Sequence, residues 1–549
     1  MTTHRMSLRP LPLTSCLAEM ADASLPGEFS AAASRPQSNR RIRYPVPAQL
    51  ERVFPTVRHR AQRQRSLVAF TWVILGRLCS RGHPLMNRVD NSCDSSFSVR
   101  CSLRWLLLVS TCAGLLATNP AAASGAGAEQ DGKLWIGTWA TAAQPQLPGN
   151  GQSYRNQTLR LIVHTSAGGK KFRIKISNTY GERPLVIGGA HMARRSADAD
   201  IDPASDRALK FHGQSSTAVP ARSMVVSDPV ELDAPGLSDL AISLFLLKAT
   251  EARTSHILAK QTSYVSPETG DHTADVRVPA ATKIHSWPFL TGVDVAASPG
   301  GEAVVAFGSS LTDGDGSTTD TNRRWPDVLA ERLQNDTNRK VEVGVLNEGI
   351  IGNRLLHDSP QQAGSPWGRA LGESGLARFD RDVLAQAGVR YVIVGLGIND
   401  IAFPGSLTPA SEPMSAESLI SGYRELIARA HKMGVRVIGA TNPPFENAFL
   451  KDPPTTFFTP EKEAVRQKVN AWILSGGEFD AVVDFDEVLR DPNHPTQLLP
   501  AYDSGDHLHP NNAGCLAEGN AIPLAWFEAP APRSSVKPTG VPKTQTKSD

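Results

Sequence analysis

Short hydrophobic runs alternate with amphipathic stretches in the second half of the chain, from Glu302 onward. The runs are rich in apolar and β-branched residues, and strands are expected at residues 303–307, 341–346, 391–396, 435–440 and 481–485. Between them hydrophobic positions recur at helical spacing, and helices are expected at residues 325–333, 376–387, 416–433 and 460–474. This alternation predicts an α/β fold with a parallel, doubly wound sheet.

The pattern before residue 290 is different, because short strand-like segments follow one another without helices. Residues 159–164 and 172–177 are the clearest, and the Gly168-Gly169 pair between them suits a hairpin loop. Further short strands are expected at residues 185–187, 224–226 and 240–246. We therefore expect an all-β, sandwich-like accessory domain over residues 133–290 and the α/β domain over residues 300–528.

The first hundred residues show no sustained periodicity and are rich in arginine. Through Arg104 the chain has 16 Arg, no Lys and 6 acidic residues, a net charge of +10, whereas the other 41 basic and 48 acidic residues give −7. Residues 1–100 are therefore expected to be a disordered or mis-assigned extension. The negative charge of the globular part argues against nucleic acid as a partner.

A basic residue, a short apolar run and a small-residue site follow one another within residues 101–124, which is the pattern of a signal peptide. The apolar run is too short for a membrane anchor, so no stable membrane insertion is expected. Translation would then start downstream, for example at Met86. A linker at residues 125–132 follows, and residues 529–549 are expected to be a disordered tail. A secreted or periplasmic protein is the resulting prediction.

Cysteine use agrees with export. Five of the six cysteines precede the expected cleavage point, and only Cys515 follows it, so no disulfide can form within the mature chain. Cys515 stands among small and apolar residues, which favours packing in a core over a role as a nucleophile.

A serine stands where the first of the predicted α/β strands ends. The hydrophobic run leads into Gly308, Ser309 and Ser310 and then into a cluster of Asp and Gly, which indicates a tight bend. Many serines at strand ends only cap a turn or a helix. About 200 residues later, however, Asp506 and His509 stand three positions apart, and such a pair can orient a histidine base toward a serine nucleophile.

Four short blocks carry this chemistry, in the order Gly308-Ser309-Ser310-Leu311, residues 347–353, Gly397-Ile398-Asn399-Asp400 and Asp506-His507-Leu508-His509-Pro510. Together, over residues 302–524, they resemble the SGNH/GDSL hydrolase family. The resemblance implies a three-layer α/β/α, flavodoxin-like fold. It implies Ser310 as nucleophile, His509 as base and Asp506 as the carboxylate that orients the base. It also implies an oxyanion hole made by the backbone N–H groups of Ser310 and Gly352 and the side-chain amide of Asn399.

The chain departs from the family at Ser309, where the family usually has Asp. That Asp is not part of the family's catalytic triad, so activity is expected to survive, and Ser309 itself is the less favoured candidate nucleophile. Asp503 and His507 could bind a metal together with the Asp506 and His509 pair, but the spacing lacks a recognised zinc pattern. We therefore expect neither a metal nor another cofactor. Asp400 could serve only to cap a helix.

The activity implied is that of a secreted serine esterase that forms an acyl-enzyme on a small-molecule or polysaccharide ester. A short-chain acyl or carbohydrate acetyl esterase is favoured, and a lipase or arylesterase is the alternative within the same chemistry. A non-catalytic polysaccharide-binding protein is the alternative from another class. Trp135, Trp139 and Tyr154 could stack on sugars in that case, although scattered aromatic residues more often belong to a core.

Overall fold

The computed structural model describes residues 134–147, 152–278, 280–361, 367–451 and 454–528. The expected N-terminal extension, signal peptide, linker and C-terminal tail lie outside the described residues.

A five-stranded parallel sheet is the centre of residues 302–527, here called the α/β region. In spatial order its strands are β21 (Val343–Asn347), β20 (Glu302–Gly308), β22 (Val389–Gly395), β23 (Arg436–Ala440) and β26 (Ala481–Val483). All four neighbouring pairs run parallel. The five predicted strands are thus confirmed, with ends that differ by at most two residues.

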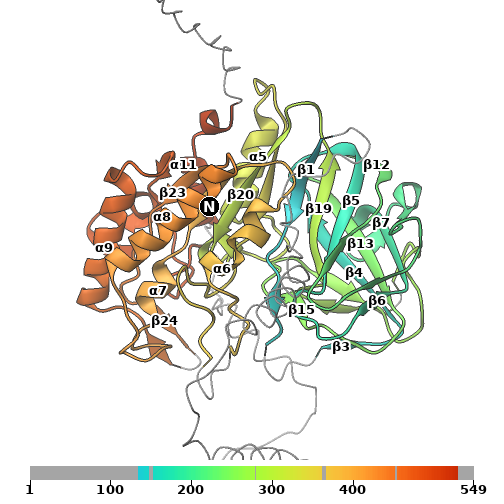
Figure 1. The fold of residues 1–549 in the computed structure, drawn as a ribbon, viewed down its shortest axis with the longest axis horizontal. Coiled ribbons are helices and arrows are strands. Elements are labelled where there is room, and N and C mark those ends of the chain that lie inside the picture. The colour runs from blue at the N-terminus through green and yellow to red at the C-terminus, as the bar shows by residue number, and fades with distance from the viewer. Residues whose placement is uncertain (1–133, 148–151, 279, 362–366, 452–453, 529–549) are drawn as a thin grey trace, which may run out of the picture. The chain divides into compact units, whose positions relative to one another are not determined.

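Helices cover both faces of this sheet, as Figure 1 shows. Alternate residues of β20 point to opposite faces: Val305 and Phe307 join one buried cluster, whereas Val304 and Ala306 join another. Helices α8 (Ala416–Lys432) and α9 (Pro460–Ser475) pack in the first cluster and α5 (Trp325–Asn335) in the second, with α11 (Asn512–Ala521) against α5. This is the predicted three-layer α/β/α fold. The helix expected at residues 376–387 is shorter, with α6 (Gly375–Phe379) running into a π-helical turn, η2 (Asp380–Leu384).

Residues 134–296, here called the β-region, contain two larger antiparallel sheets. One comprises β4 (Gln157–His164), β7 (Gly189–Ala197), β8 (Asp200–Ile201), β9 (Arg207–Ala208), β13 (Asp239–Leu246), β16 (Ser263–Val265) and β17 (Thr282–Ile284). The other comprises β1 (Trp135–Ala140), β5 (Gly169–Ser177), β11 (Met224–Val226), β12 (Val230–Ala234) and β19 (Leu290–Ala296). Leu161 of β4 and Ile174 of β5 lie in the same buried cluster, so the two sheets pack face to face as in a sandwich.

The predicted hairpin between residues 159–164 and 172–177 is wrong. Both segments are strands, but β4 pairs with β13 and β16, whereas β5 pairs with β19, β11 and β12. The Gly168-Gly169 pair therefore carries the chain from one sheet to the other. A Cβ at Gly168 would lie 2.3 Å from the Gly236 nitrogen, so the glycine serves a close backbone approach at this corner.

The remaining elements are short. They are β2 (Gln144–Pro145), β3 (Ser153–Tyr154), β6 (Leu185–Ile187), η1 (Pro203–Ser205), β10 (Thr217–Val219), β14 (Thr250–Glu251), β15 (Thr254–His256), β18 (Trp287–Pro288), α4 (Ser310–Asp313), α7 (Ile398–Ala402), β24 (Phe449–Leu450), β25 (Thr455–Thr456), α10 (Phe485–Leu489), β27 (Arg490–Asp491), β28 (His494–Leu498) and η3 (Leu524–Phe527).

The β-region packs on the edge strand of the parallel sheet, and both regions belong to one compact unit. Gly137 of β1 donates its N–H to Ala387 O at 2.8 Å, and Ser166 Oγ accepts from Val345 N at 2.8 Å. A Cβ at Gly344 would lie 1.9 Å from Gly137 O, so only glycine allows β1 to approach β21 this closely. The two regions are therefore held together by direct backbone contact.

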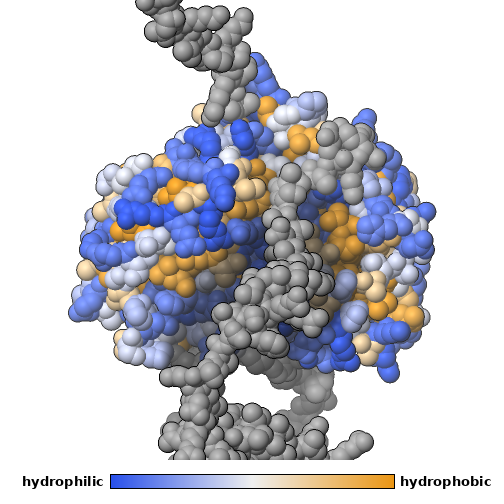
Figure 2. All heavy atoms as spheres, in the orientation of Figure 1, coloured by the Kyte–Doolittle hydropathy of each residue, from blue (hydrophilic) through white to orange (hydrophobic). Residues whose placement is uncertain are grey.

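The surface in view is largely hydrophilic, with hydrophobic residues in separate groups, as Figure 2 shows. Large exposed hydrophobic side chains such as Met224, Leu247 and Leu474 come from different parts of the chain. Within the described residues, no helix combines the length and the hydrophobicity needed to cross a bilayer.

Candidate active site

Ser310 lies where β20 leaves the sheet. The strand ends at Gly308, and Ser310 is the first residue of the one-turn helix α4. Gly314 ends this turn with φ of 104°, a conformation that favours glycine. Ser310 is therefore held at the carboxyl end of a parallel strand, where open α/β sheets place their ligand sites.

The structure brings Ser310, His509 and Asp506 together. His509 Nε2 lies 2.8 Å from Ser310 Oγ, and His509 Nδ1 lies 2.6 Å from Asp506 Oδ2. The second oxygen, Asp506 Oδ1, accepts from the backbone N–H groups of Leu508 at 3.0 Å and His509 at 2.9 Å. The backbone N–H groups of its own turn thus fix the Asp506 carboxylate. The carboxylate then fixes the orientation of the His509 ring. This is the arrangement that the spacing of Asp506 and His509 predicts.

Burial and charge have opposite effects on the pKa values of His509 and Asp506. Burial alone would lower the pKa of His509, but the charges of Asp506 and Asp315 and the hydrogen bond to Asp506 raise it to about 9. Burial alone would raise the pKa of Asp506, but the charge and the hydrogen bonds of His509 hold it well below its usual range. The two groups therefore stabilise each other in their charged forms.

Asp315 is a second carboxylate beside the imidazole, and the sequence indicated it only as part of a turn. Its Oδ2 lies 3.8 Å from His509 Nε2, and its side chain is 5% exposed. Lys260 of the β-region reaches it from the other side, with Nζ 4.0 Å from Asp315 Oδ1. The position of Asp315 in an acidic turn five residues after Ser310 is the signal that could have marked it.

Gly352 and Asn399 line the same pocket as Ser310 and His509. Gly352 has φ of 68°, and Asn399 lies in the first turn of α7, after β22. The Asn399 Nδ2 donates to Asn353 O at 3.0 Å, which fixes the amide plane next to the glycine block. The three predicted oxyanion groups are therefore gathered at one end of the sheet.

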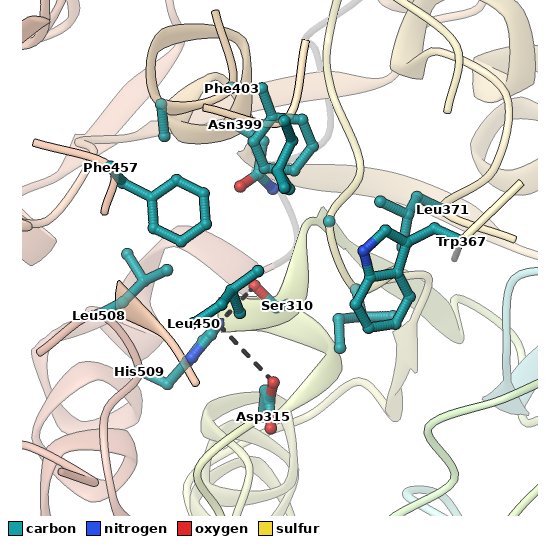
Figure 3. Close-up of a pocket in the computed structure, with 14 residues that line it drawn as sticks. Ser310, Asp315, Trp367, Leu371, Asn399, Phe403, Leu450, Phe457, Leu508 and His509 are labelled. Atoms are coloured by element: carbon teal, nitrogen blue, oxygen red, sulfur yellow. Dashed lines mark hydrogen bonds and ion pairs between the residues drawn. The ribbon is translucent and has the colours of Figure 1, made fainter. Parts of the chain in front are cut away.

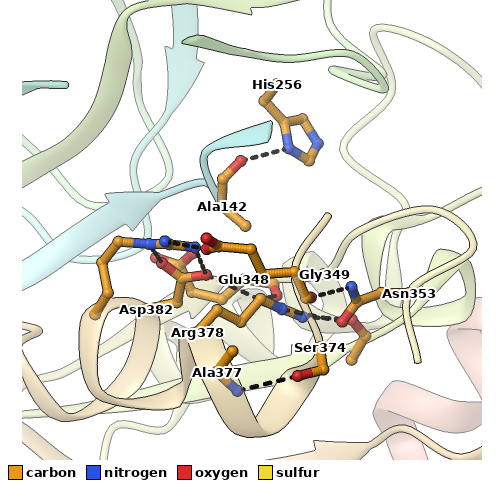
Figure 4. A network of polar contacts seen from close by, with 12 residues as sticks. Ala142, His256, Glu348, Gly349, Asn353, Ser374, Ala377, Arg378 and Asp382 are labelled. Atoms are coloured by element: carbon orange, nitrogen blue, oxygen red, sulfur yellow. Dashed lines mark hydrogen bonds and ion pairs between the residues drawn. The ribbon is translucent and has the colours of Figure 1, made fainter. Parts of the chain in front are cut away.

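A buried arginine that the sequence did not indicate connects several loops of the α/β region, and Figure 4 shows its contacts with Glu348, Asn353 and Asp382. Arg378 of α6 donates to Gly308 O at 3.0 Å, to Glu348 O at 2.8 Å and to Asn353 Oδ1 at 3.0 Å. It also forms an ion pair with Asp382 at 3.2 Å, and its side chain is fully buried. Arg378 thereby ties the end of the serine strand to the glycine block.

Asp400 does not cap a helix. Its carboxylate accepts the backbone N–H groups of Leu355 at 2.6 Å and Leu356 at 2.9 Å, in the loop that follows the glycine block. Burial, which outweighs these hydrogen bonds, raises the pKa of Asp400 to about 6. Its function in the fold is therefore to hold that loop.

Three neighbouring residues stay outside the hydrogen-bonded chain of Ser310, His509 and Asp506. Ser309 is buried, and its Oγ has no hydrogen-bond partner among the described residues. His507 is exposed and pairs with Asp503 at 2.5 Å. Cys515 is 0% exposed on α11, in agreement with the predicted core position. Among the described residues, no group of three or more His, Cys, Asp or Glu side chains could hold a metal ion.

The walls of the pocket are mainly apolar. Figure 3 shows Trp367 and Leu371 on one side of Ser310 and Phe457 and Leu508 on the other. The apolar lining residues are Ile351, Trp367, Leu371, Ala402, Phe403, Leu407, Leu450, Phe457 and Leu508. Polar groups are concentrated around the serine, which separates a reactive end from an apolar end.

The region of the chain that holds this pocket matches a known protein family. The model of the GDSL-like lipase/acylhydrolase family matches residues 306–516. No curated protein matches this chain. Two similar solved structures are the aryl esterase of M. smegmatis, at 18% identity, and Est24, a carbohydrate acetylesterase from Sinorhizobium meliloti, at 17% identity. Each match covers 40% of this chain and 95% of the other, with TM-scores of 0.30 and 0.29.

The family match covers the four blocks that carry the resemblance noted in the sequence. It begins within β20, before Ser310, and ends after His509, so it encloses the pocket and the five strands beneath it except for the first residues of β20. Residues 306–516 are therefore a GDSL-like lipase/acylhydrolase domain.

Proposed function

We propose that the protein hydrolyses carboxylic esters through an acyl-enzyme on Ser310. The observation that carries the proposal is the continuous hydrogen-bonded chain from Ser310 Oγ through His509 to Asp506, at 2.8 Å and 2.6 Å, inside a pocket. A hydroxyl, an imidazole and an oriented carboxylate in this order are what activates a serine.

Each group then has a defined role in the reaction. Neutral His509 takes the proton of Ser310 as Oγ attacks the ester carbonyl, and Asp506 stabilises the imidazolium that forms. The N–H groups of Ser310, Gly352 and Asn399 donate to the developing oxyanion. His509 then protonates the departing alcohol, and the acyl-enzyme is hydrolysed by water that His509 activates in the same way.

The pKa of His509 determines the pH range in which the proposed ester hydrolysis is fast. The base must be neutral to accept a proton, and the pKa of about 9 keeps it protonated at lower pH. The rate on a neutral ester should therefore rise with pH and level off above about 9.

The apolar lining favours an ester with an apolar acyl or aryl group over an acetylated polysaccharide. Phe403, Leu450 and Phe457 offer hydrocarbon contacts but no hydrogen bonds to a sugar. The aromatic residues that could have stacked on sugars, Trp135, Trp139 and Tyr154, are all buried. Removal of acetyl groups from carbohydrate is thus the less favoured candidate.

Export is the second part of the proposal. It depends on the signal-like sequence at residues 101–124 and on the single cysteine that follows it. Sequencing the N-terminus of protein collected from the outside of producing cells would test it. A mature chain that begins within residues 1–100 would contradict export through this signal.

The decisive experiment is hydrolysis of p-nitrophenyl acetate, butyrate and octanoate by the purified protein. Ser310→Ala should lower kcat by at least about 10³-fold, because the nucleophile is lost. Ser309→Ala is the matched control and should keep nearly full activity, since its Oγ contacts no reacting group. Turnover that survives in Ser310→Ala would contradict the proposed mechanism. Turnover of acetylated xylan alone would contradict the proposed preference for an apolar ester.

A further inference from the structure

A histidine of the β-region reaches the turn that carries Ser310. His256, the last residue of β15, has its Nε2 2.9 Å from Asp313 Oδ1 and its Nδ1 3.0 Å from Ala142 O. The side chains of His256 and Asp313 are each 2% exposed. The ring also packs on Trp287, with centroids 5.7 Å apart, and that indole donates to Ile162 O at 2.8 Å. The imidazole is therefore held from three sides.

Hydrogen-bond accounting defines the contact with Asp313. The carbonyl of Ala142 can only accept, so Nδ1 must carry a hydrogen. A proton must then also lie between Nε2 and the Asp313 carboxylate, because two bare acceptors would repel at 2.9 Å. The contact is therefore a hydrogen bond between two side chains that are each 2% exposed.

Asp313 connects His256 to the backbone beside the pocket. It is the last residue of α4, whose first residue is Ser310, and its Oδ2 accepts the N–H of Ile351 at 2.9 Å. Ile351 directly precedes Gly352, whose N–H is one of the proposed oxyanion donors. One carboxylate therefore joins the serine turn, the peptide before Gly352 and a strand of the β-region.

We propose that His256 is a positioning residue for the oxyanion hole, acting through Asp313 and Ile351. The inference rests on the proposed esterase function. His256 contributes no atom to the pocket, since every lining residue lies between Ser310 and His509 in the sequence. Its effect is to hold Asp313 in the orientation that fixes the Ile351 and Gly352 peptides. The β-region is accordingly a part of the catalytic machinery and not a detachable binding module.

Two amide substitutions separate this role from a general structural one. His256→Gln places an amide nitrogen near the position of Nε2, so it keeps a donor for Asp313 and loses the bond to Ala142. His256→Asn places one near the position of Nδ1, so it keeps the bond to Ala142 and loses the one to Asp313. Each substitution removes one buried hydrogen bond, so a purely structural role would lower the free energy of unfolding in both variants without a selective loss of kcat in His256→Asn.

The expected result is a difference in kcat on p-nitrophenyl butyrate, measured with the full-length protein. His256→Asn should lower kcat about 10- to 100-fold with little change in KM, because oxyanion stabilisation acts in the transition state. His256→Gln should stay within about threefold of the wild type. Thr262→Val is the matched control, since it removes the 2.5 Å bond from Thr262 Oγ1 to Asp320 between the same two regions without touching Asp313. Its kcat should be unchanged.

Asp313→Asn breaks the same chain from the other end and gives the second measurement. The double variant of His256→Asn and Asp313→Asn should lose no more kcat than Asp313→Asn alone. Equal kcat in His256→Asn and His256→Gln, or additive losses in the double variant, would overturn the positioning role. If Ser310→Ala is inactive in either event, the proposed esterase function stands and only this inference fails.

Discussion

The α/β region and the β-region serve one pocket in different ways. The α/β region supplies every lining residue, including Ser310, Asn399 and His509, each in a loop or turn beyond the parallel strands. The β-region supplies His256, which contacts Asp313 in the turn that begins at Ser310, and Lys260, which contacts Asp315 just after that turn. One region therefore presents the reactive groups, and the other holds the turn that carries one of them.

The difference follows from what each kind of group must do. A reacting atom has to stand at one point relative to the substrate, so its neighbours in the sequence are constrained as well, and short recognisable blocks result. A supporting side chain only has to reach its partner from some element of the fold. Support can therefore come from a strand far away in the sequence without any local pattern.

Loss of a reactive group should give the largest effect on the rate. Asn399→Ala removes one proposed oxyanion donor and should lower kcat about 10²–10³-fold. The free energy of unfolding should fall by only about 1–3 kcal/mol, because Asn353 O loses one donor. Steady-state kinetics and thermal unfolding of the same sample measure both. A loss of kcat below tenfold would contradict the division of tasks between the two regions.

Loss of a buried supporting residue in the β-region should lower the stability of the protein and leave kcat unchanged. Arg160 is fully buried and donates to Ala199 O at 2.7 Å, to Asp275 O at 2.6 Å and to Ser243 Oγ at 3.0 Å. Arg160→Met leaves these acceptors without a donor and should lower the free energy of unfolding by on the order of 3 kcal/mol. The folded variant should keep its kcat.

The control for Arg160 is an exposed arginine of the same region. Arg155 pairs with Glu268 at 2.6 Å, but both side chains are more than half exposed, at 66% and 52%. Arg155→Met should change the free energy of unfolding by less than about 1 kcal/mol. Denaturant unfolding of both variants tests the contrast, and similar losses in the two would refute it.

The smallest expected effect is on the pH dependence, and the two regions should act in opposite directions. The charge of Asp315 raises the pKa of His509, so Asp315→Asn should lower that pKa and move the rise of kcat/KM toward lower pH. The charge of Lys260 lowers the pKa of His509, so Lys260→Met should move the rise toward higher pH. Profiles of kcat/KM against pH measure both shifts. Shifts in the same direction would show that these two charges do not control the pKa of His509.

The strands of the α/β region could be predicted because each is a short hydrophobic run. Val304 and Val305 face opposite sides of the sheet, yet both are 0% exposed, so no polar residue interrupts the run. In the β-region, the alternation in residues 172–177 correctly predicted a strand. It could not predict the partner, because alternation reports which face is buried and not which strand lies beside it.

The same limit applies to the site. Ser310, Asp506 and His509 could be found because each belongs to a short block near a strand end or a turn. His256 lies 57 positions from Asp313, and the carbonyl of Gly308 lies 70 positions from Arg378. Only the folded chain brings such partners together, and a single histidine or arginine has no local feature that distinguishes it from the others.

The position of β1 in the chain determines when this strand can pair. Trp135 at its start pairs with Ala296 at the end of β19, and the strand also packs on β21 of the parallel sheet. The first strand of the described chain must therefore wait until about 160 residues more have been synthesised before its partner exists. Contacts of such high sequence separation close slowly, and until then the apolar face of β1 is exposed to aggregation or to chaperones.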